Sequence, residues 1–333
     1  MSITRRTIAG RQVNPVGLGC MSLSWAYGTP PSDEDGARLL DRALDLGYDH
    51  LDTARIYGTG HNETLIGQTL KGRRNQFFLA SKTGIIVDGQ KRRIDCKPET
   101  IRAALEESLR LLQTDHIDLY YLHRRDFAVP IEDSVGALAD LVKEGKIGAI
   151  GLSEMSAETV RRAHATHPVA ALQTEYSPMT RNPEIAVLEV CRELGITFVA
   201  FSPVGRGLLA DPALDVASLP EKDIRLAMPR FQDGNFAHNR DLAARFGAIA
   251  AREGVTPAQL ALAWVLSRGE HVVAIPGTMR PDHLAENIAR WDWAIPASTA
   301  SEVDALINQQ TVAGHRYGAA MRPTIDTEDF AEA

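Results

Sequence analysis

The stretch FFLASKTGIIVDGQKRRIDCKPETIRAALEESLRLLQTDHIDLYYLH at residues 77–123 decides the fold of this chain. Its apolar runs at 77–82 and 117–123 have the length of buried strands. Between them, apolar residues recur at helical spacing over 98–112, and a proline occupies the first position of that pattern. A strand, a helix and a second strand in this order are typical of a parallel βαβ unit.

The same unit recurs along most of the chain. Apolar runs predict strands at 16–20, 50–52, 77–82, 117–123, 149–153, 171–176, 197–202 and 272–276. Helical patterns follow at 33–46, 62–70, 98–112, 131–144, 157–167, 183–194, 239–253 with 257–268, and 281–290. Eight such units predict the α/β class and a (β/α)8 TIM barrel. We expect one domain over 1–333, with an N-terminal hairpin at about 4–15, the barrel at about 16–290, and a C-terminal helix and tail at about 291–333.

The composition is ordinary for a globular protein, with 44% hydrophobic and 24% charged residues. The net charge of −7 argues against nucleic acid as a partner, because phosphate binding needs a basic face. Neither a signal segment nor a run of roughly 18 apolar residues is present, so we expect no membrane partner and a cytoplasmic location. Wide spacing of the cysteines predicts no disulfide framework and no metal site: Cys20, Cys96 and Cys191.

A glycine pair after the first apolar run invites comparison with another nucleotide-binding fold. Gly17-Leu18-Gly19 begins a G-x-G pattern, but Ser22 stands where a Rossmann fingerprint needs its third glycine. We therefore reject a Rossmann fold. The sequence also contains no HExxH, P-loop or GxSxG motif, which removes three other classes of catalytic site.

Four polar residues stand at or just after the ends of predicted strands: Asp52, Tyr57, Lys82 and His123. The carboxyl ends of the strands are where such barrels place their active sites. Together these groups can donate a proton to a carbonyl oxygen. A nearby cation lowers the pKa of the phenol from its reference value of about 10, and a carboxylate holds that cation in place. The imidazole can polarise and orient the carbonyl.

Several motifs of matching order and spacing resemble one enzyme family. This chain resembles the aldo-keto reductases in four signature segments: DTARIYG at 52–58 with Asn62-Glu63, YYLHRRD at 120–126, IPGTMR at 275–280 and LAEN at 284–287. A closer resemblance, to the subgroup of bacterial and plant members that includes perakine reductase, lies in two further segments: RRAHATHPVAALQTEYS at 161–177 and CRELGITFVAFSPVGRGLL at 191–209. The resemblance places the N-terminal hairpin across the barrel floor.

What the resemblance implies is NADPH-dependent reduction of aldehydes and ketones to alcohols. Hydride passes from the nicotinamide to the carbonyl carbon, and Tyr57 acts as general acid. The expected partner is a small-molecule carbonyl substrate, while the oligomeric state stays open. An alternative within the superfamily is an NADP(H)-binding regulatory subunit that senses redox state and turns over slowly.

The resemblance also assigns cofactor contacts, residue by residue. Ser153, Glu154 and Gln173 correspond to positions that hold the carboxamide, and Phe201 to the aromatic residue that stacks on the nicotinamide. The pyrophosphate belt, the loop that contacts the pyrophosphate in the family, corresponds to Ser202, Pro203, Val204, Gly205, Arg206 and Gly207. The family's contacts to the adenosine end of the cofactor correspond to Gly277, Thr278, Arg280, His283, Glu286 and Asn287. An arginine beside a helix N-terminus suits a 2′-phosphate and favours NADPH over NADH, although Met279 replaces a lysine common in relatives.

Three other features lead to expectations about the barrel mouth. A substrate pocket is expected from Trp25, Tyr27, Arg124, Phe127 and Met179. The long segment 203–236 interrupts the strand-helix rhythm, which predicts a mobile flap that orders when the cofactor binds. The basic cluster Lys91-Arg92-Arg93 is typical of a solvated loop.

Overall fold

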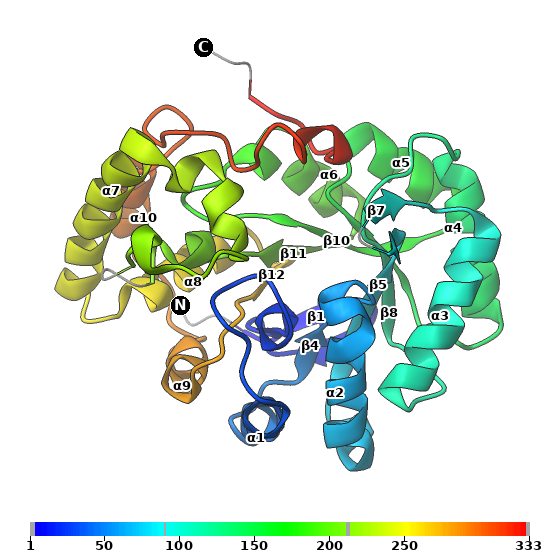
Figure 1. Ribbon diagram of the computed structural model, residues 1–333. Coiled ribbons are helices and arrows are strands. Elements are labelled where there is room, and N and C mark those ends of the chain that lie inside the picture. The colour runs from blue at the N-terminus through cyan, green and yellow to red at the C-terminus, as the bar shows by residue number, and fades with distance from the viewer. Residues whose placement is uncertain (1–3, 90, 211–213, 331–333) are drawn as a thin grey trace.

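The eight predicted strands form one parallel sheet in the computed structural model, which describes residues 4–89, 91–210 and 214–330 (Figure 1). In spatial order they are β12 (Val272–Ile275), β11 (Thr197–Phe201), β10 (Val169–Glu175), β9 (Ile150–Ser153), β8 (Leu119–Leu122), β5 (Phe78–Thr83), β4 (His50–Asp52) and β3 (Leu18–Gly19). A parallel bridge between Val16 and Ala274 joins the two edges of the sheet. The predicted (β/α)8 barrel is therefore confirmed.

The seam of the barrel depends on close backbone approach. Gly17 N donates to Ala274 O at 2.8 Å, and Gly19 N donates to Pro276 O at 3.1 Å. A Cβ at Gly19 would lie 2.8 Å from Ile275 O, and one at Gly277 would lie 2.9 Å from Gly19 O. Glycine is required here because any side chain would push the first and last units apart.

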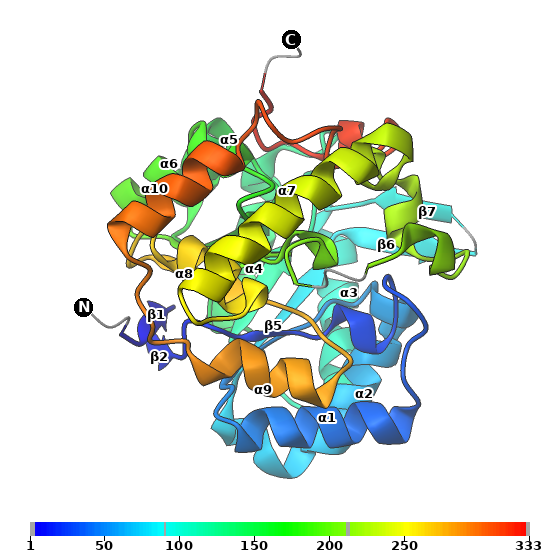
Figure 2. The same ribbon diagram turned by 90° about the vertical axis from the view of Figure 1, so that its left-hand side faces the viewer.

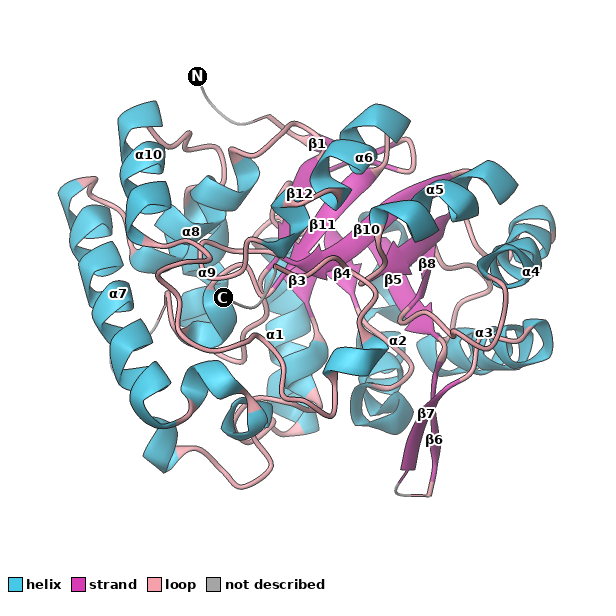
Figure 3. Ribbon diagram, turned by 90° about the horizontal axis from the view of Figure 1, so that it is seen from above, coloured by secondary structure: helices cyan, strands magenta, loops and turns pink. Residues whose placement is uncertain are grey.

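Helices surround the strands on the outside of the barrel, as Figure 3 shows from above. They are α1 (Asp33–Asp45), α2 (His61–Leu70), α3 (Pro98–Leu112), α4 (Ile131–Lys143), α5 (Ala157–Thr166), α6 (Val187–Leu194), α7 (Asp233–Arg252), α8 (Pro257–Leu266), α9 (Pro281–Ala289) and α10 (Ala297–Leu306). Their apolar faces and the outward-facing strand residues form the main hydrophobic core. Most of the bounds lie within two residues of those predicted from the sequence.

Helix α7 is the clearest difference, because it begins at Asp233 and not near 239. Its first turn contains Gly234 and Asn235, which have weak helix propensity. Tertiary contacts outweigh that preference: the Phe236 ring stacks on Phe231 with centroids 6.3 Å apart. In addition, Asn235 Nδ2 donates to Pro229 O at 3.0 Å. Figure 2 shows α7 running beside α10.

The N-terminal hairpin closes one end of the barrel. Strands β1 (Arg6–Ile8) and β2 (Arg11–Val13) pair antiparallel, and Ala9 and Gly10 take positive φ in the turn between them. Ile8 and Val13 are fully buried in a second apolar cluster that includes inward-facing residues of the barrel strands. The predicted hairpin is thus confirmed, and its position leaves the opposite end of the barrel open for a site.

A second hairpin was missed by the sequence analysis. Strands β6 (Ile85–Asp88) and β7 (Lys91–Ile94) pair antiparallel and project from the barrel after β5 (Figure 3). The predicted loop at Lys91-Arg92-Arg93 is wrong, since these residues lie in β7, although Arg92 and Arg93 are exposed as expected. The guanidinium of Arg92 stacks on the Trp25 ring, 4.3 Å from its centroid. The hairpin thus reaches the loop that follows β3.

The long segment 203–236 contains several short 3-10 turns: η5 (Gly205–Gly207), η6 (Val216–Ser218), η7 (Ile224–Ala227) and η8 (Pro229–Phe231). Its residues 211–213 lie outside the described part of the chain. Ile224 N donates to Ala26 O at 3.0 Å, and Gly28 N donates to Asp223 Oδ2 at 2.7 Å. The segment is therefore tied to the loop after β3, which lies two strands further round the barrel from β11.

Candidate active site

The four polar residues predicted to act together are brought to one end of the barrel. Asp52 ends β4, Lys82 lies near the end of β5, and His123 directly follows β8. These three strands are neighbours in the sheet, so their carboxyl ends lie side by side. Tyr57 begins the 3-10 turn η2 (Tyr57–Gly60) in the loop after β4, and all four side chains are buried.

Lys82 is the centre of this group. Its ammonium donates to the phenol oxygen of Tyr57 at 3.3 Å and to Thr53 O at 2.8 Å, and it forms an ion pair with Asp52 Oδ1. The other carboxylate oxygen of Asp52 accepts a hydrogen bond from Gln173 Nε2 at 2.7 Å. All three donors of the ammonium thus have partners, and Lys82 is held against the phenol.

Burial governs how Tyr57 and Lys82 titrate. Burial raises the pKa of Tyr57 above its usual range, and the adjacent Lys82 ammonium offsets this only in part. The net direction is opposite to the lowering expected from the sequence, because composition and motifs carry no information about desolvation. Burial alone would lower the pKa of Lys82, but Asp52 and Tyr57 favour the ammonium, and the net pKa lies above its usual range. Tyr57 is therefore a protonated phenol at neutral pH, and Lys82 is charged.

His123 is neutral in the same site. Burial lowers the pKa of its imidazole well below the usual range, and the charges of Arg124, Lys82 and Arg92 lower it further. The ring lies edge-on to the Tyr57 ring, with centroids 5.9 Å apart. A neutral imidazole has one N–H to donate. The phenol and the imidazole can therefore both donate to one oxygen atom placed between them.

The residues expected to hold a carboxamide lie on the strands next to the tetrad. Ser153 ends β9 and accepts a hydrogen bond from Arg124 Nη1 at 3.5 Å. Gln173, on β10, is linked to Asp52 as described above. Phe201 ends β11 and is partly exposed at the mouth. These three residues thus face the tetrad across the end of the barrel.

The belt residues after β11 form a tight turn. Gly205 N donates to Ser202 O at 3.0 Å, and Gly207 N donates to Val204 O at 3.2 Å. Ser202 and Arg206 both take positive φ, an uncommon state for residues with side chains that is found mainly where surrounding structure imposes it. Pro203 lies between Ser202 and Val204 in the same turn.

The expected adenosine end lies at the N-terminus of α9. Thr278 Oγ1 accepts from Arg280 N at 3.0 Å, and the Arg280 guanidinium forms an exposed ion pair with Asp282. Gly277 is exposed, whereas Asn287 is buried, and both lie on this unit next to the barrel seam. His283 and Glu286 are partly exposed on α9. A helix N-terminus with an arginine beside it is suited to a phosphate group.

A family model described as Aldo/keto reductase family matches residues 15–308. The chain belongs to this family. A relative called "Probable aldo-keto reductase 1", from Glycine max, is 42% identical over 310 residues, which are 92% of this chain and 89% of that protein. "Aldo-keto reductase yakc [NADP(+)]", from Schizosaccharomyces pombe, is 41% identical over 336 residues, with 98% of both chains covered.

Solved structures of other reductases share the fold along the whole chain. The glycerol dehydrogenase AKR11B4 from Gluconobacter oxydans superposes with a TM-score of 0.84 at 27% identity, covering 100% of this chain and 99% of that one. An aldo-keto reductase from Klebsiella pneumoniae, solved in complex with NADPH, gives a TM-score of 0.72 at 26% identity, covering 94% and 99%. This chain is accordingly an oxidoreductase.

The expected pocket residues of this aldo/keto reductase divide into buried and exposed groups. Met179 and Arg124 are buried, and Tyr27 accepts a hydrogen bond from Arg206 Nη1 at 3.0 Å. Trp25 is covered by Arg92 of the β6–β7 hairpin. Phe127 is 59% exposed and lies under the Arg125 guanidinium, 4.7 Å from its centroid. Phe127 is therefore at the outer rim of the mouth and not in its interior.

Glu154 has a role that the motif comparison did not reveal. Arg316 Nη1 and Nη2 donate to its two carboxylate oxygens, both at 2.7 Å, and Thr327 Oγ1 donates to one of them at 2.9 Å. Glu154 is fully buried, and its backbone oxygen accepts from Asp326 N at 3.0 Å. The side chain expected to hold a carboxamide is thus occupied by the C-terminal segment, residues 313–330.

The C-terminal segment is a part of the mouth that no sequence signal identified. Arg316 also lies 3.6 Å from Glu175 Oε2, and Glu175 in turn pairs with Arg206 at 2.7 Å. Asp326 accepts from Ser156 N at 3.0 Å. Figure 1 shows this segment, in red, along the top of the molecule. Arg316 lies 162 residues from Glu154 in the sequence, and Arg206 lies 31 residues from Glu175. No local pattern therefore links the members of either pair.

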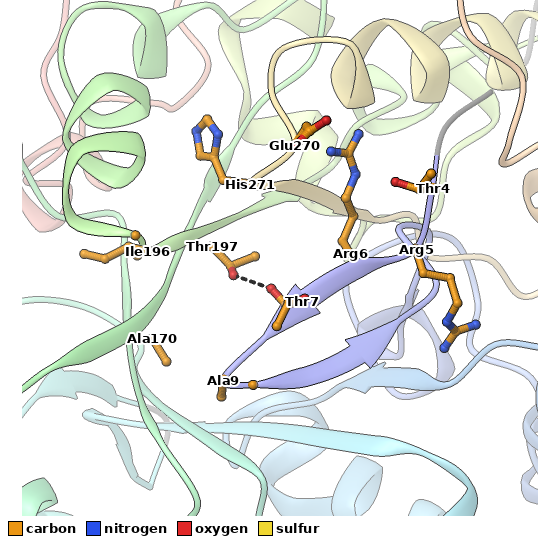
Figure 4. A pocket seen from close by; sticks show the side chains of 12 residues that line it. Thr4, Arg5, Arg6, Thr7, Ala9, Ala170, Ile196, Thr197, Glu270 and His271 are labelled. Atoms are coloured by element: carbon orange, nitrogen blue, oxygen red, sulfur yellow. Dashed lines mark hydrogen bonds between the residues drawn. The ribbon is translucent and has the colours of Figure 1, made fainter. Parts of the chain in front are cut away.

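A hollow of about 470 Å³ lies at the other end of the barrel (Figure 4). It is lined by the N-terminal hairpin and by the starts of β10, β11 and β12, including Arg6, Thr197 and His271. In a parallel barrel these are the amino ends of the strands, opposite to the tetrad. The hollow is therefore separate from the active site.

Among the described residues there is neither a metal site nor a membrane-spanning helix. They include no group of three or more His, Cys, Asp or Glu side chains that could hold a metal ion. Within the described ranges, no helix is both long and apolar enough to cross a membrane. All three cysteines are buried and free.

Proposed function

We propose that this reductase converts aldehydes and ketones to alcohols with NADPH, and that Tyr57 is the general acid. The observation that carries the proposal is the buried chain of contacts from Asp52 through Lys82 to the phenol of Tyr57. The phenol is protonated at neutral pH because burial raises its pKa. A protonated donor beside a fixed cation is what carbonyl reduction requires of the protein.

The proposed mechanism assigns one task to each residue. Tyr57 donates its proton to the carbonyl oxygen, and the Lys82 ammonium, 3.3 Å away, stabilises the phenolate that remains. Asp52 keeps Lys82 charged and in position. The neutral imidazole of His123 donates a hydrogen bond to the same oxygen and stabilises its developing negative charge. When bound, NADPH supplies the hydride that reaches the carbonyl carbon.

The residues at the mouth fit an extended dinucleotide. Phe201 offers a partly exposed ring at the end of β11, and Ser153 and Gln173 offer polar groups beside it. Ser202–Gly207 form a turn with little side-chain bulk, and Gly277, Thr278, Arg280, His283, Glu286 and Asn287 lie at the first turns of α9 or just before it. A relative named for NADP(+) and a structural neighbour solved with NADPH support this cofactor.

A direct assay tests the proposed function. NADPH oxidation is followed by absorbance with 4-nitrobenzaldehyde, whose electron-withdrawing ring activates the carbonyl. We expect turnover that requires both the aldehyde and the nucleotide. Tight NADP(H) binding without turnover of any activated aldehyde or ketone would instead support the nucleotide-sensing regulatory subunit.

Replacing Arg280 with Ala is expected to weaken NADPH binding by about 10- to 100-fold, the scale of a hydrogen bond between charged groups. NADH binding should be nearly unchanged, because NADH has no 2′-phosphate. Quenching of protein fluorescence gives both dissociation constants. Arg290→Ala is the matched control, since Arg290 is an exposed arginine at the other end of α9. Equal weakening of both cofactors by Arg280→Ala would assign Arg280 a structural part.

Cofactor binding is expected to raise amide protection across 205–236. The segment follows the belt turn, and its contacts with Ala26 and Gly28 place it across the mouth where the dinucleotide is proposed to lie. Hydrogen exchange is measured with and without saturating NADP⁺. Peptides from α3 serve as the internal control, because that helix lies on the outside of the barrel. Unchanged protection over 205–236 would identify the segment as a fixed wall.

A further inference from the structure

A buried arginine beside the tetrad forms no ion pair within the described part of the chain. Arg124 directly follows His123 at the end of β8, and its side chain is 7% exposed. Its Nη1 donates to His123 O at 2.6 Å and to Ser153 Oγ at 3.5 Å, while its Nε is buried without a hydrogen-bond partner. Among the described residues, no carboxylate oxygen is paired with this guanidinium. The contacts of Arg124 are thus to neutral acceptors only.

The nearby carboxylates are already neutralised by other arginines. Glu154 receives two hydrogen bonds from Arg316, and Glu175 receives two from Arg206. Arg124 attracts Glu154 but is not bonded to it, so its guanidinium keeps unused hydrogen-bonding capacity in this buried part of the mouth. Unpaired buried donors are costly, and a ligand of opposite charge that accepts from them removes that cost.

The charge of Arg124 acts on the place where chemistry is proposed. Together with burial, the guanidinium contributes to lowering the pKa of His123. Arg92 adds a further positive charge from the β6–β7 hairpin, where it covers Trp25. The two guanidinium groups of Arg124 and Arg92 thus lie close enough to act on His123, although the whole chain carries a net charge of −7. A field of this kind attracts anions and repels cations.

We propose that Arg124 selects carbonyl substrates that carry a carboxylate, which it binds while the carbonyl oxygen lies between Tyr57 and His123. This inference rests on the proposed reductase function and adds a substrate class to it. The planar guanidinium can donate charge-assisted hydrogen bonds to a carboxylate. Arg124 is thus a specificity-determining residue, and oxo acids are the expected class of substrate.

The proposed selectivity for carboxylates is first tested on the wild-type enzyme. Initial rates of NADPH oxidation are measured with 2-, 3- and 4-carboxybenzaldehyde and with the methyl ester of each. The ester withdraws electrons more strongly than the carboxylate does, so intrinsic reactivity favours the ester. We expect at least one free acid to exceed its ester by about tenfold or more in kcat/KM, a typical effect of a charged hydrogen bond. A preference for the ester in all three pairs overturns the proposal.

Variants then assign the preference to Arg124. Arg124→Gln should bring the acid-to-ester ratio of kcat/KM to about one or below, mainly through a higher KM for the acid. Arg124→Lys should restore part of the ratio, because it keeps the charge but not the planar fork. Arg102→Gln makes the same change in net charge on the outer surface at α3, where Arg102 pairs with Glu144, and should leave the ratio unchanged.

Three outcomes separate this inference from its alternatives. Loss of NADPH affinity in Arg124→Gln with an unchanged acid-to-ester ratio would assign Arg124 to the cofactor and overturn the proposal. Absence of turnover with every acid and every ester contradicts the reductase function itself. Turnover of the esters with no advantage for any acid contradicts only the carboxylate selectivity. Thermal unfolding of each variant shows that the fold is retained.

Discussion

Tyr57→Phe is expected to lower kcat for aldehyde reduction by at least about 100-fold, in line with general-acid contributions of roughly 10²–10⁴. The ring remains in place, so the substitution removes only the proton donor and its contact with Lys82. NADPH affinity should be almost unchanged, because the phenol makes none of the proposed nucleotide contacts. Absorbance assays give kcat, and fluorescence titration gives the dissociation constant of NADPH.

A neighbouring tyrosine provides the control for this experiment. Tyr120 is fully buried on β8, and its hydroxyl has no hydrogen-bond partner among the described residues. Tyr120→Phe should therefore leave kcat close to that of the wild type. If Tyr57→Phe behaves like Tyr120→Phe, the assignment of the general acid is wrong.

The pH dependence of the same reaction follows from the direction of the pKa shift. The proton donor is the neutral phenol, which is the form present below its pKa. Since burial raises that pKa above the usual range, the rate of reduction should not fall through loss of the Tyr57 proton between about pH 6 and 9. Loss of activity with a midpoint near neutral pH that is absent from Tyr57→Phe would contradict the raised pKa.

Arg316→Met is expected to lower the free energy of unfolding by about 3–5 kcal/mol, the usual effect of removing one partner of a buried ion pair. Glu154 is fully buried, and two of its hydrogen bonds come from Arg316. Without that guanidinium the carboxylate stays desolvated and unpaired. Urea unfolding monitored by circular dichroism gives the difference between the variant and the wild type.

Two further variants show whether the cost comes from the unpaired charge. The double variant Glu154→Gln/Arg316→Met removes both charges and should recover a large part of the lost stability. Arg102→Gln breaks an exposed ion pair with Glu144, and its effect should be below about 1 kcal/mol. If Arg316→Met costs no more than Arg102→Gln, the pair does not hold the C-terminal segment.

The same ion pair predicts that the free energy of unfolding depends on pH in the acid range. Although burial alone would raise the pKa of Glu154, Arg316 outweighs it and the pKa is lowered to about 2. A carboxyl with a lowered pKa in the folded state contributes stability above its unfolded pKa of about 4.3, and this contribution is lost as the pH falls toward 2. In Glu154→Gln/Arg316→Met this contribution to the acid dependence should be missing.

The number of strands, their order along the chain and the meeting of the four tetrad residues at one end of the barrel followed from the sequence. Apolar runs of strand length alternate with helical patterns, and this local periodicity reflects burial that repeats in every unit. Because all strands of such a barrel run the same way, Asp52, Lys82 and His123 had to meet once each was placed at a strand end. Long-range information was not needed for that step.

One local signal was present but not used. Asp88-Gly89 is a common hairpin turn, and Gly89 takes a φ of +60° between β6 and β7. The flanking residues lack clear alternation, since the sequence continues into a basic cluster. The hairpin and the contact of Arg92 with Trp25 therefore emerged only from the fold.

The sequence by itself determined the barrel and the composition of the tetrad, because these depend on residue types at regular spacing. Only the tertiary structure decided the pairing of Glu154 with Arg316, the net rise in the pKa of Tyr57 and the lack, among the described residues, of an ion pair for Arg124. Each of these depends on which side chains meet across the mouth and on how much water they lose. Such distances and burial arise when segments far apart in the chain pack together, and no local pattern encodes them.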